Sequence, residues 1–233
     1  MTSVVSYGGG TNSAAMLAGL NERGERPDLV LFADTGGEKP ETYEHIKIVS
    51  QWCVSIGFPE IITVKAPNVT LEQDCLARKA LPSVAYGFKT CSQRWKRQPQ
   101  DKYLNSIGMK DAMRLIGIDA GESHRAKDFP NNRYPLIEWG WDRKECIEAI
   151  ARANLPQPGK SSCFFCPNSK PREIISLPDF LKNRAIEMER NAELTTIAGL
   201  GRTWRWEDLI RADREQMDMF KCYSEMPCEC YDG

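Results

Sequence analysis

The sequence lacks the features of a membrane protein, of a strongly basic nucleic-acid-binding protein and of a histidine-rich metal site. No apolar run in its 233 residues approaches the roughly 20 residues of a membrane span. Its 31 Lys and Arg balance 32 Asp and Glu, so bulk electrostatic attraction to nucleic acid is not expected, and only a local basic patch stays open. The two histidines, His45 and His124, are too few for a His-rich zinc site.

Targeting signals, internal repeats and flexible linkers are also missing from the sequence. The N-terminal residues carry no signal-peptide pattern, so we expect a cytoplasmic protein without a membrane partner. Nine cysteines are many for such a protein. Because disulfides are disfavoured in a reducing compartment, metal binding or redox chemistry is the default interpretation of these thiols.

Strand and helix patterns alternate along most of the chain, which predicts an α/β fold with a parallel sheet of about five strands. Expected strands lie at 3–7, 28–33, 60–64 and 114–118, with an edge piece at 134–137. Expected helices lie at 12–23, 40–56 and 141–154. From about residue 160, cysteine-bearing loops alternate with helical stretches near 171–193 and 206–220. We therefore predict an α/β domain at 1–155 and a helical C-terminal extension at 156–233, packed on the sheet.

A glycine-rich turn with hydroxyl side chains follows the first expected strand. Such a turn points backbone N–H groups and a helix N-terminus at one spot, and its glycines let an anion approach closely, so it predicts a phosphate site. Asn12 or Ser13 is expected to cap the helix. The Walker A lysine and the Rossmann glycine spacing are absent. The predicted anion-binding residues are Ser6, Gly8, Gly9, Gly10, Thr11, Asn12 and Ser13.

A second polar segment, Asp34-Thr35-Gly36-Gly37-Glu38-Lys39-Pro40-Glu41-Thr42, follows the buried strand at 28–33. Loops that follow parallel strands lie at the carboxyl edge of the sheet, where open α/β folds bind ligands. Pro40 and Glu41 suit the first turn of a helix. Asp34, Thr35 and Gly36 are therefore predicted to lie beside the bound ligand.

Several cysteines have the spacing of metal ligands. Cys163 and Cys166 form a Cys-x-x-Cys pair in a polar loop, and Cys91 is the best third ligand. A fourth could come from Cys222, Cys228 or Cys230, and we select Cys228. An iron–sulfur cluster, a structural zinc ion and a redox dithiol or inert thiols all stay open. The remaining three cysteines fall on apolar helix faces and are expected in the core, namely Cys53, Cys75 and Cys146.

Basic and aromatic residues supply further candidates. Arg94, Lys96 and Arg97 could clamp phosphate or sulfate groups, as could Arg125 and His124 after the fourth strand. Glu122 could orient Mg²⁺ or cap a helix, and both interpretations stay open. The residues expected to be structural are His45, Trp139, Trp141, Trp204 and Trp206.

The glycine turn and the Asp-Thr-Gly…Pro-Glu-Thr segment resemble the two signatures of the PP-loop superfamily of ATP pyrophosphatases and adenylylsulfate reductases. Asn12 stands where that family more usually has an aspartate. The wider layout includes Thr90-Cys91-Ser92, the Gly-Ile-Asp-Ala-Gly-Glu-Ser segment at 117–123 and the Cys-x-x-Cys pair. It resembles the phosphoadenylylsulfate (PAPS) reductase-like proteins common in phage genomes, and it is similar to the sulfurtransferases of DNA phosphorothioation.

This resemblance implies a PP-loop fold of the adenine nucleotide α-hydrolase type, binding ATP or PAPS with Mg²⁺. It implies sulfur transfer driven by ATP, with a cluster held by Cys91, Cys163, Cys166 and Cys228, or zinc in its place. Cys91, Cys230 and Arg94 become the candidate catalytic residues, and Arg125 a candidate nucleotide contact. The implied partners are a sulfur donor and an acceptor that could be a nucleic acid.

Two alternatives to sulfur transfer stay open. The first is a thiol-dependent reductase of PAPS or its unphosphorylated analogue, reset by thioredoxin. Glu229-Cys230 echoes the reductase tail, but the Gly-x-His that accompanies it in that family is absent. The second is a nucleotide- or DNA-binding accessory protein without catalysis, which Asn12 and the incomplete tail favour.

Overall fold

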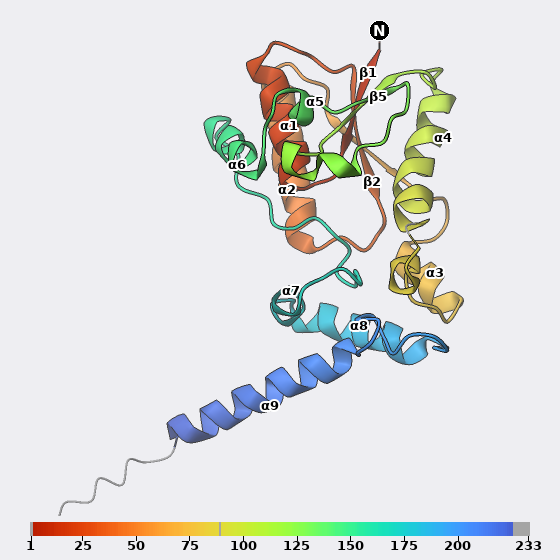
Figure 1. Ribbon diagram of the computed structural model, residues 1–233, viewed down its shortest axis with the longest axis vertical. Helices are drawn as coiled ribbons and strands as arrows, with labels where there is room; N and C mark the ends of the chain where they lie inside the picture. Colours follow the sequence, from red (N-terminus) through yellow and green to blue (C-terminus); the bar gives the residue numbers. More distant parts are fainter. Residues whose placement is uncertain (1, 89, 226–233) are drawn as a thin grey trace, which may run out of the picture. The chain divides into compact units, whose positions relative to one another are not determined.

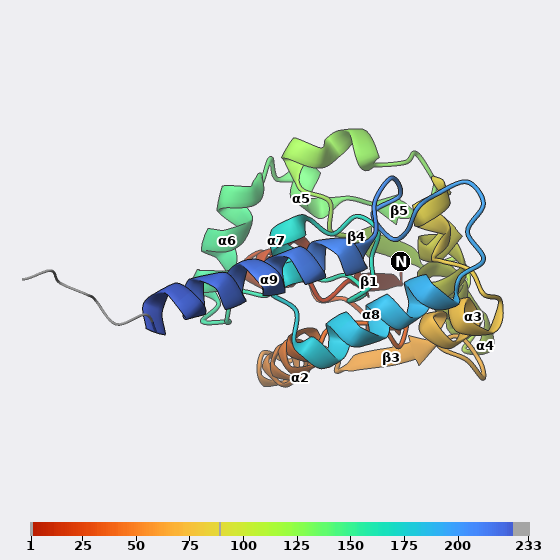
Figure 2. The same ribbon diagram turned by 90° about the horizontal axis from the view of Figure 1, so that it is seen from below.

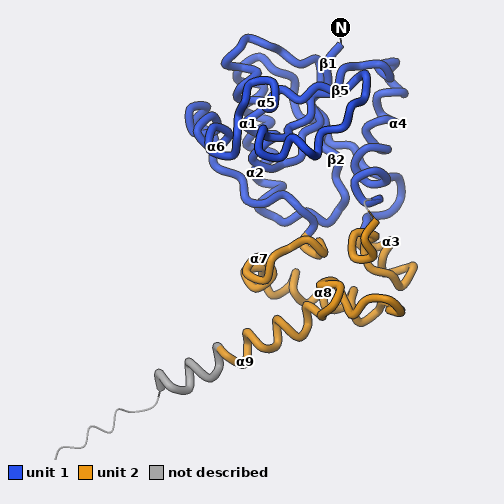
Figure 3. Tube along the Cα trace, viewed as in Figure 1, with its two compact units in different colours: residues 1–71, 90–163 blue, residues 72–89, 164–233 orange. Residues whose placement is uncertain are grey.

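A computed structural model describes residues 2–88 and 90–225, with side chains to residue 216. The chain divides into two compact units (Figure 3). Unit 1 comprises residues 1–71 and 90–163, and unit 2 comprises residues 72–89 and 164–233. Unit 1 therefore includes residues 156–163, whereas a segment from the N-terminal half of the chain, 72–89, belongs with the C-terminal helices. Among the described residues, no helix combines the length and the apolar character needed to cross a membrane.

A parallel sheet forms the centre of unit 1 (Figure 1). Its described strands follow the order β3-β2-β1-β4-β5, and every neighbouring pair is parallel. The predicted α/β class and the parallel sheet of about five strands are thus confirmed. The strands are β1 (Ser3–Tyr7), β2 (Leu29–Asp34), β3 (Ile61–Lys65), β4 (Met113–Ile116) and β5 (Asn132–Arg133).

Helices cover both faces of this sheet, with α1 and α2 on one side of the strands and α4 on the other (Figures 1 and 2). Alternate strand residues explain the two layers, because successive side chains point to opposite faces. Val5, Tyr7 and Phe32 pack into one core, and Val4, Leu31 and Val64 into a second. The helices of unit 1 are α1 (Thr11–Glu22), α2 (Pro40–Ser55), α4 (Gln98–Ser106), α5 (Pro135–Glu138) and α6 (Arg143–Arg152). Shorter turns are the π-helix η2 (Ser92–Arg97) and the 3₁₀-helix η3 (Ala120–Arg125).

Two local predictions in unit 1 were wrong. The expected edge strand at 134–137 is the short helix α5, and β5 lies just before it. Pro135 occupies the first turn of that helix, where its missing N–H is not needed. The N-cap of α1 is Gly10, not Asn12 or Ser13. Ser13 is instead the third residue of the helix, where its Oγ accepts a hydrogen bond from the N–H of the N-cap residue Gly10 at 3.3 Å.

Unit 2 is helical in its described part. Its elements are α3 (Leu71–Ala77, whose first residue belongs to unit 1), η1 (Ser83–Tyr86), α7 (Pro171–Ile175), α8 (Asp179–Asn191) and α9 (Trp206–Glu225). The helical stretch expected at 171–193 is interrupted before α8 because Pro178 occupies the N-cap position of that helix.

A buried carboxylate organises the C-terminal part of unit 2. Glu189 on α8 accepts hydrogen bonds from the backbone N–H groups of Leu200 (2.7 Å), Trp206 (2.9 Å) and Glu207 (3.1 Å). Two of these groups belong to the first turn of α9, so a side chain of α8 fixes where α9 begins. Burial raises the pKa of Glu189, and the three N–H donors oppose that rise.

Tryptophans pack against a glycine of α1, as the structural interpretation of these residues predicted. The rings of Trp139 and Trp141 meet edge to face, with centroids 5.1 Å apart, and the Arg23 guanidinium lies 4.0 Å from the Trp139 centroid. A Cβ on Gly19 would lie 2.4 Å from Trp139 and 2.8 Å from Trp141. Gly19 is therefore required by packing and not by backbone conformation.

We predict that Gly19→Ala destabilises the protein by about 1–3 kcal/mol through overpacking. Without the tryptophans, the same change inside a helix would stabilise by about 0.5–1 kcal/mol, so the sign is diagnostic. Gly159→Ala is the matched control, since a Cβ there meets nothing within 4 Å. Urea denaturation measures both variants, and a Gly19→Ala protein as stable as the wild type would contradict this packing.

Candidate functional site

The carboxyl edge of the unit 1 sheet contains a topological switch point. From β1 the chain crosses through α1 to β2 on one side, whereas β4 pairs with β1 on the other side. In open α/β sheets, ligands bind beyond the carboxyl ends of the strands at such a point, where the loops that follow the strands diverge. The glycine turn, the Asp34–Glu38 segment and the loop after β4 all lie at this edge.

The glycine turn leads directly into α1. Gly9 has φ +72°, a left-handed conformation that favours glycine, and the first intrahelical bond runs from the Ala14 N–H to the Gly10 carbonyl at 3.1 Å. The N–H groups of the first helical residues have no partner within the helix and point beyond its N-terminus. Beside Gly8 there is room, because a Cβ there would meet only Ser13 Oγ, at 3.8 Å. This arrangement suits an anion.

Asn12 links the glycine turn to the loop after β4. Its Nδ2 donates to Asp119 Oδ2 at 2.9 Å, and its Oδ1 accepts from Arg143 at 3.3 Å. Asp119 is buried and also caps η3, accepting from the Glu122 N–H at 3.0 Å. An aspartate at position 12 would place a second carboxylate at hydrogen-bonding distance from Asp119, and the two would repel. An asparagine can instead donate a hydrogen bond to Asp119. Sequence reasoning did not single out Asp119 or Arg143.

The segment after β2 is held by its own side chains. Asp34 Oδ1 accepts from the Gly36 N–H and from the Tyr43 hydroxyl, both at 2.8 Å. Burial and the neighbouring Asp34 raise the pKa of Tyr43, so this hydroxyl stays a donor. Gly36 has φ +72°, and a Cβ there would lie 2.3 Å from Thr70, so no other residue fits this position. The backbone of this loop is thus fixed before any ligand arrives.

A distant segment, residues 160–163, returns to both of these loops. Cys163 forms an isolated antiparallel bridge with Glu38, and its Sγ lies 3.1 Å from Thr35 Oγ1. Two residues earlier, Ser161 Oγ would lie 2.5 Å from a Cβ on Gly10. The first cysteine of the Cys-x-x-Cys pair therefore lies at the same edge as the glycine turn, and it is partly exposed.

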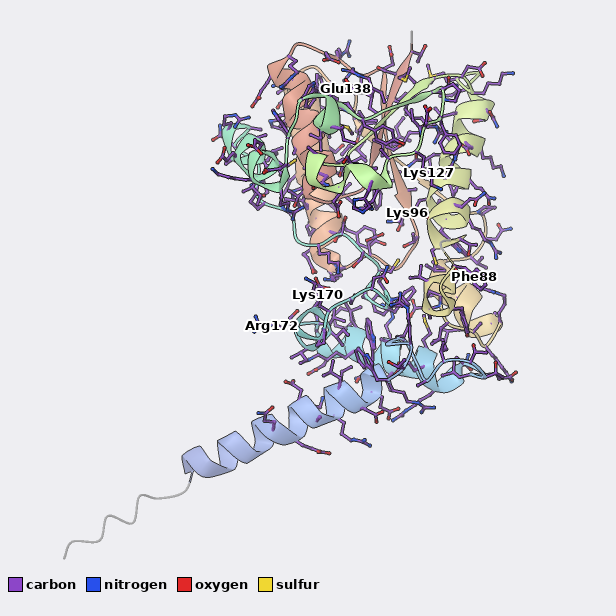
Figure 4. The ribbon with its side chains drawn as sticks, viewed as in Figure 1. Phe88, Lys96, Lys127, Glu138, Lys170 and Arg172 are labelled. Carbon is purple, nitrogen blue, oxygen red and sulfur yellow. The ribbon has the colours of Figure 1, made fainter. Side chains whose placement is uncertain are left out.

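Glu38 is the buried acid of this edge. Its side chain has no exposed area, and its Oε1 accepts from Lys96 Nζ at 3.2 Å. Lys96 belongs to the π-helix η2 and is labelled in Figure 4. Within residues 2–88 and 90–216, the buried side-chain polar atoms without a partner are Glu38 Oε2, Ser162 Oγ and Trp206 Nε1. Glu38 is paired with Cys163 in the bridge, and Ser162 directly precedes Cys163, so the first two of these atoms lie at this edge. Buried polar atoms in proteins almost always have a hydrogen-bond partner, so two without one close together are unusual.

The predicted metal ligands are only partly placed. Cys91 and Cys163 belong to unit 1 and Cys166 to unit 2, whereas Cys228 and the candidate nucleophile Cys230 lie outside the described residues. In the described part of the chain, no three His, Cys, Asp or Glu side chains gather closely enough to hold a metal ion. The metal centre stays a prediction from the sequence, with Cys91, Cys163, Cys166 and Cys228 as its ligands.

The other predicted site residues have identifiable neighbours. The Ser6 hydroxyl donates to Gln100 on α4 at 2.9 Å, a contact that the sequence did not suggest. Arg94 lies over Trp95, with 5.4 Å between its Cζ and the ring centroid. Arg125 pairs with Glu122, and the cap of η3 is Asp119, not Glu122. Among the basic candidates, Lys96 forms an ion pair with Glu38 in the segment after β2.

Comparisons with known proteins give structural likenesses and no match of sequence. No protein-family model and no curated protein matches the sequence. Among solved structures, the chain is similar to a phosphoadenylyl-sulfate (PAPS) reductase from Candida auris in its phosphate complex, with 16% identity and a TM-score of 0.46. The likeness covers 70% of this chain and 80% of that chain.

The cysteines separate into two groups by burial. Cys53, Cys75 and Cys146 are buried, which confirms their predicted place in the core, whereas Cys91, Cys163 and Cys166 are partly exposed. Burial raises the pKa of Cys53 to about 12 and that of Cys146 to about 12. Only the thiolate reacts with alkylating reagents. Both the burial and the raised pKa of these two thiols therefore protect them from alkylation.

We predict that iodoacetamide at pH 8 labels Cys91, Cys163 and Cys166 in the reduced native protein and leaves Cys53 and Cys146 unmodified. At a pKa of about 12, only about one molecule in 10⁴ carries the thiolate at that pH. Peptide mass spectrometry after a short pulse measures each site, and the urea-denatured protein serves as the positive control. Rapid labelling of Cys53 in the native protein would contradict the assigned burial.

Proposed function

We propose that this protein is a PP-loop enzyme of the PAPS-reductase-like type that binds an adenine nucleotide at the carboxyl edge of unit 1. The polyphosphate would lie in the glycine turn at residues 8–13. The nucleoside would lie along the loop after β2. The activity that we propose for this arrangement is ATP-dependent sulfur transfer.

The observation that carries the proposal is the placement of Cys163. A loop whose backbone suits a phosphate, a second loop of the predicted signature and a partly exposed thiol lie together, although Cys163 comes 128 residues after Thr35 in the sequence. Orphaned buried acceptors and hydroxyls at this edge, on Glu38 and Ser162, are the kind of groups that a polar ligand satisfies. A purely structural βα turn accounts for none of these features.

Sulfur transfer would follow in two displacements. An acceptor oxygen attacks the α-phosphorus of ATP, the α,β bond breaks, and pyrophosphate leaves into the glycine turn. A sulfur nucleophile then attacks the activated acceptor and displaces AMP. Backbone N–H donors at the turn and the α1 N-terminus would stabilise the negative charge on the departing pyrophosphate.

An external donor of sulfane sulfur would first transfer a sulfur atom to the Cys163 thiolate, giving a persulfide and the donor's free thiol. The terminal sulfur of the persulfide would attack the activated acceptor and displace AMP. An added dithiol would then reduce the S–S bond, which releases the thiolated product, restores the Cys163 thiol and leaves the dithiol as a disulfide.

Cys163 lies beside Thr35, and in this proposal it would act next to the bound nucleotide. The thiolate of Cys163 would be the reactive form. An iron–sulfur cluster or zinc on Cys91, Cys163, Cys166 and Cys228 would serve the same step, but three such ligands do not come together among the described residues. No step is therefore assigned to a cluster.

Gly8→Ala tests the anion site without disturbing the fold. A Cβ at Gly8 meets only Ser13 Oγ at 3.8 Å, so stability should change by less than about 0.5 kcal/mol. The added methyl would occupy the space that a phosphate needs, so affinity for ATP or PAPS should fall by at least about 10-fold, roughly the value of one charge-assisted hydrogen bond. Isothermal titration measures both nucleotides, with Gly159→Ala as the control. Unchanged affinity in Gly8→Ala would place the nucleotide elsewhere.

Pyrophosphate release separates the proposed activity from the reductase alternative. Incubation with ATP, a sulfur acceptor, a sulfane-sulfur donor and a dithiol should release pyrophosphate and AMP in equal amounts. Release of sulfite from PAPS in the presence of thioredoxin, without pyrophosphate from ATP, would instead identify a reductase. Iron, zinc and sulfide analysis of protein purified without oxygen tests the cluster independently, and metal-free protein of full activity would remove it from the mechanism.

A further inference from the structure

We infer that Glu38 binds the ribose of the nucleotide, its Oε2 accepting a hydrogen bond from a ribose hydroxyl. The inference rests on the proposed nucleotide site and deepens it by naming the group that this edge recognises. Glu38 lies in the loop after β2, the strand that pairs with β1. No local pattern distinguishes Glu38 from the other polar residues of its segment.

Burial makes an unpartnered carboxylate oxygen at this position costly. The Glu38 side chain has no exposed area. Its Oε1 accepts from Lys96 Nζ at 3.2 Å, and its Oε2 has no hydrogen-bond partner among the residues that the structure describes. Nearby hydroxyls are engaged elsewhere: Thr35 Oγ1 with Cys163 and the Gly37 N–H, and the Tyr43 hydroxyl with Asp34. A buried acceptor without a donor loses its solvation uncompensated, so a donor from a bound molecule would stabilise it.

The short path from the glycine turn to Glu38 favours ribose over the base. Ser161 lies against Gly10, and Cys163, two residues farther, is at most about 7 Å away along the chain. Cys163 faces Glu38 across an antiparallel bridge, where opposed Cα atoms are about 5 Å apart. In an adenine nucleotide the ribose is attached directly to the phosphates, whereas the base amine lies at the far end. The donor nearest an anchored phosphate chain is therefore a ribose hydroxyl.

Charge balance makes an acid acceptable beside a polyphosphate. A lone carboxylate would repel the anion. The ammonium group of Lys96 forms an ion pair with Glu38 and neutralises the charge of that carboxylate. The remaining oxygen then acts as a strong acceptor without adding net negative charge. In other open α/β nucleotide sites a carboxylate after the second strand binds a ribose hydroxyl. Here Asp34 ends β2 and holds its own loop, and Glu38, four residues farther, is the acid with an unpartnered oxygen.

Titrations of ATP, 2′-deoxy-ATP and 3′-deoxy-ATP into the wild type and variants test the inference. Loss of the recognised hydroxyl should weaken binding to the wild type by about 10-fold or more, the value of a hydrogen bond to a charged group. In Glu38→Ala, ATP should bind as weakly as the deoxy analogue, and the discrimination should disappear. Glu38→Gln keeps the shape of the side chain and should retain part of the discrimination, because its amide can donate to the hydroxyl oxygen.

Controls separate a local effect from misfolding and from the wider proposal. Glu44→Gln removes an exposed carboxylate of α2 and should bind all three nucleotides like the wild type. Circular dichroism shows whether Glu38→Ala is folded, and Glu38→Gln serves if it is not. Wild-type protein that binds ATP and both deoxy analogues equally would overturn the role of Glu38 alone. Wild-type protein that binds no adenine nucleotide would overturn the proposed function as well.

A base-recognition role would give a different pattern. Inosine triphosphate lacks the base amine of ATP. Suppose that Glu38→Ala no longer discriminates between ATP and inosine triphosphate but still discriminates between ATP and its deoxy analogues. Glu38 would then contact the base, and the inference would be wrong. If inosine triphosphate discrimination is the same in the wild type and in Glu38→Ala, the ribose assignment is supported.

Discussion

The antiparallel bridge between Glu38 and Cys163 is the contact on which the candidate site depends. It joins the loop after β2 to a segment that follows α6, and the same segment lies against Gly10 of the glycine turn. One backbone pairing thereby brings a thiol, a buried acid and the predicted anion cradle to one edge of one unit. Without it, the glycine turn would be an ordinary βα connection and Cys163 a loop cysteine.

Two acids at this edge each have a fixed partner, and the partner of Glu38 is a cation. Asp119 is engaged by the Asn12 amide and Glu38 by the Lys96 ammonium. Each acid also has a mechanical role, because Asp119 ties the loop after β4 to α1 and Glu38 ties the loop after β2 to η2. The glycine turn is therefore framed by fixed loops on both sides, which is the preorganisation that electrostatic catalysis requires.

The sequence predicted those parts of the structure that local patterns determine. β1, β2, β3 and β4 lie within about two residues of their expected positions because buried strands and glycine turns leave strong local signals. The edge piece at 134–137 was wrong because proline suits a helix start as well as an edge strand. The burial of Glu38, the Asn12–Asp119 pair and the Ser6–Gln100 bond arise from long-range packing, which no local pattern encodes. The inclusion of residues 72–89 in unit 2 has the same origin.

A crystal structure of the protein with a non-hydrolysable ATP analogue tests the central claim most directly. The account predicts electron density for the phosphates within hydrogen-bonding distance of the backbone N–H groups at residues 8–13, with the nucleoside along Asp34–Glu38. It also predicts that Cys163 lies beside the bound nucleotide, next to Thr35. A nucleotide bound at another surface, with the glycine turn filled by water alone, would contradict the account.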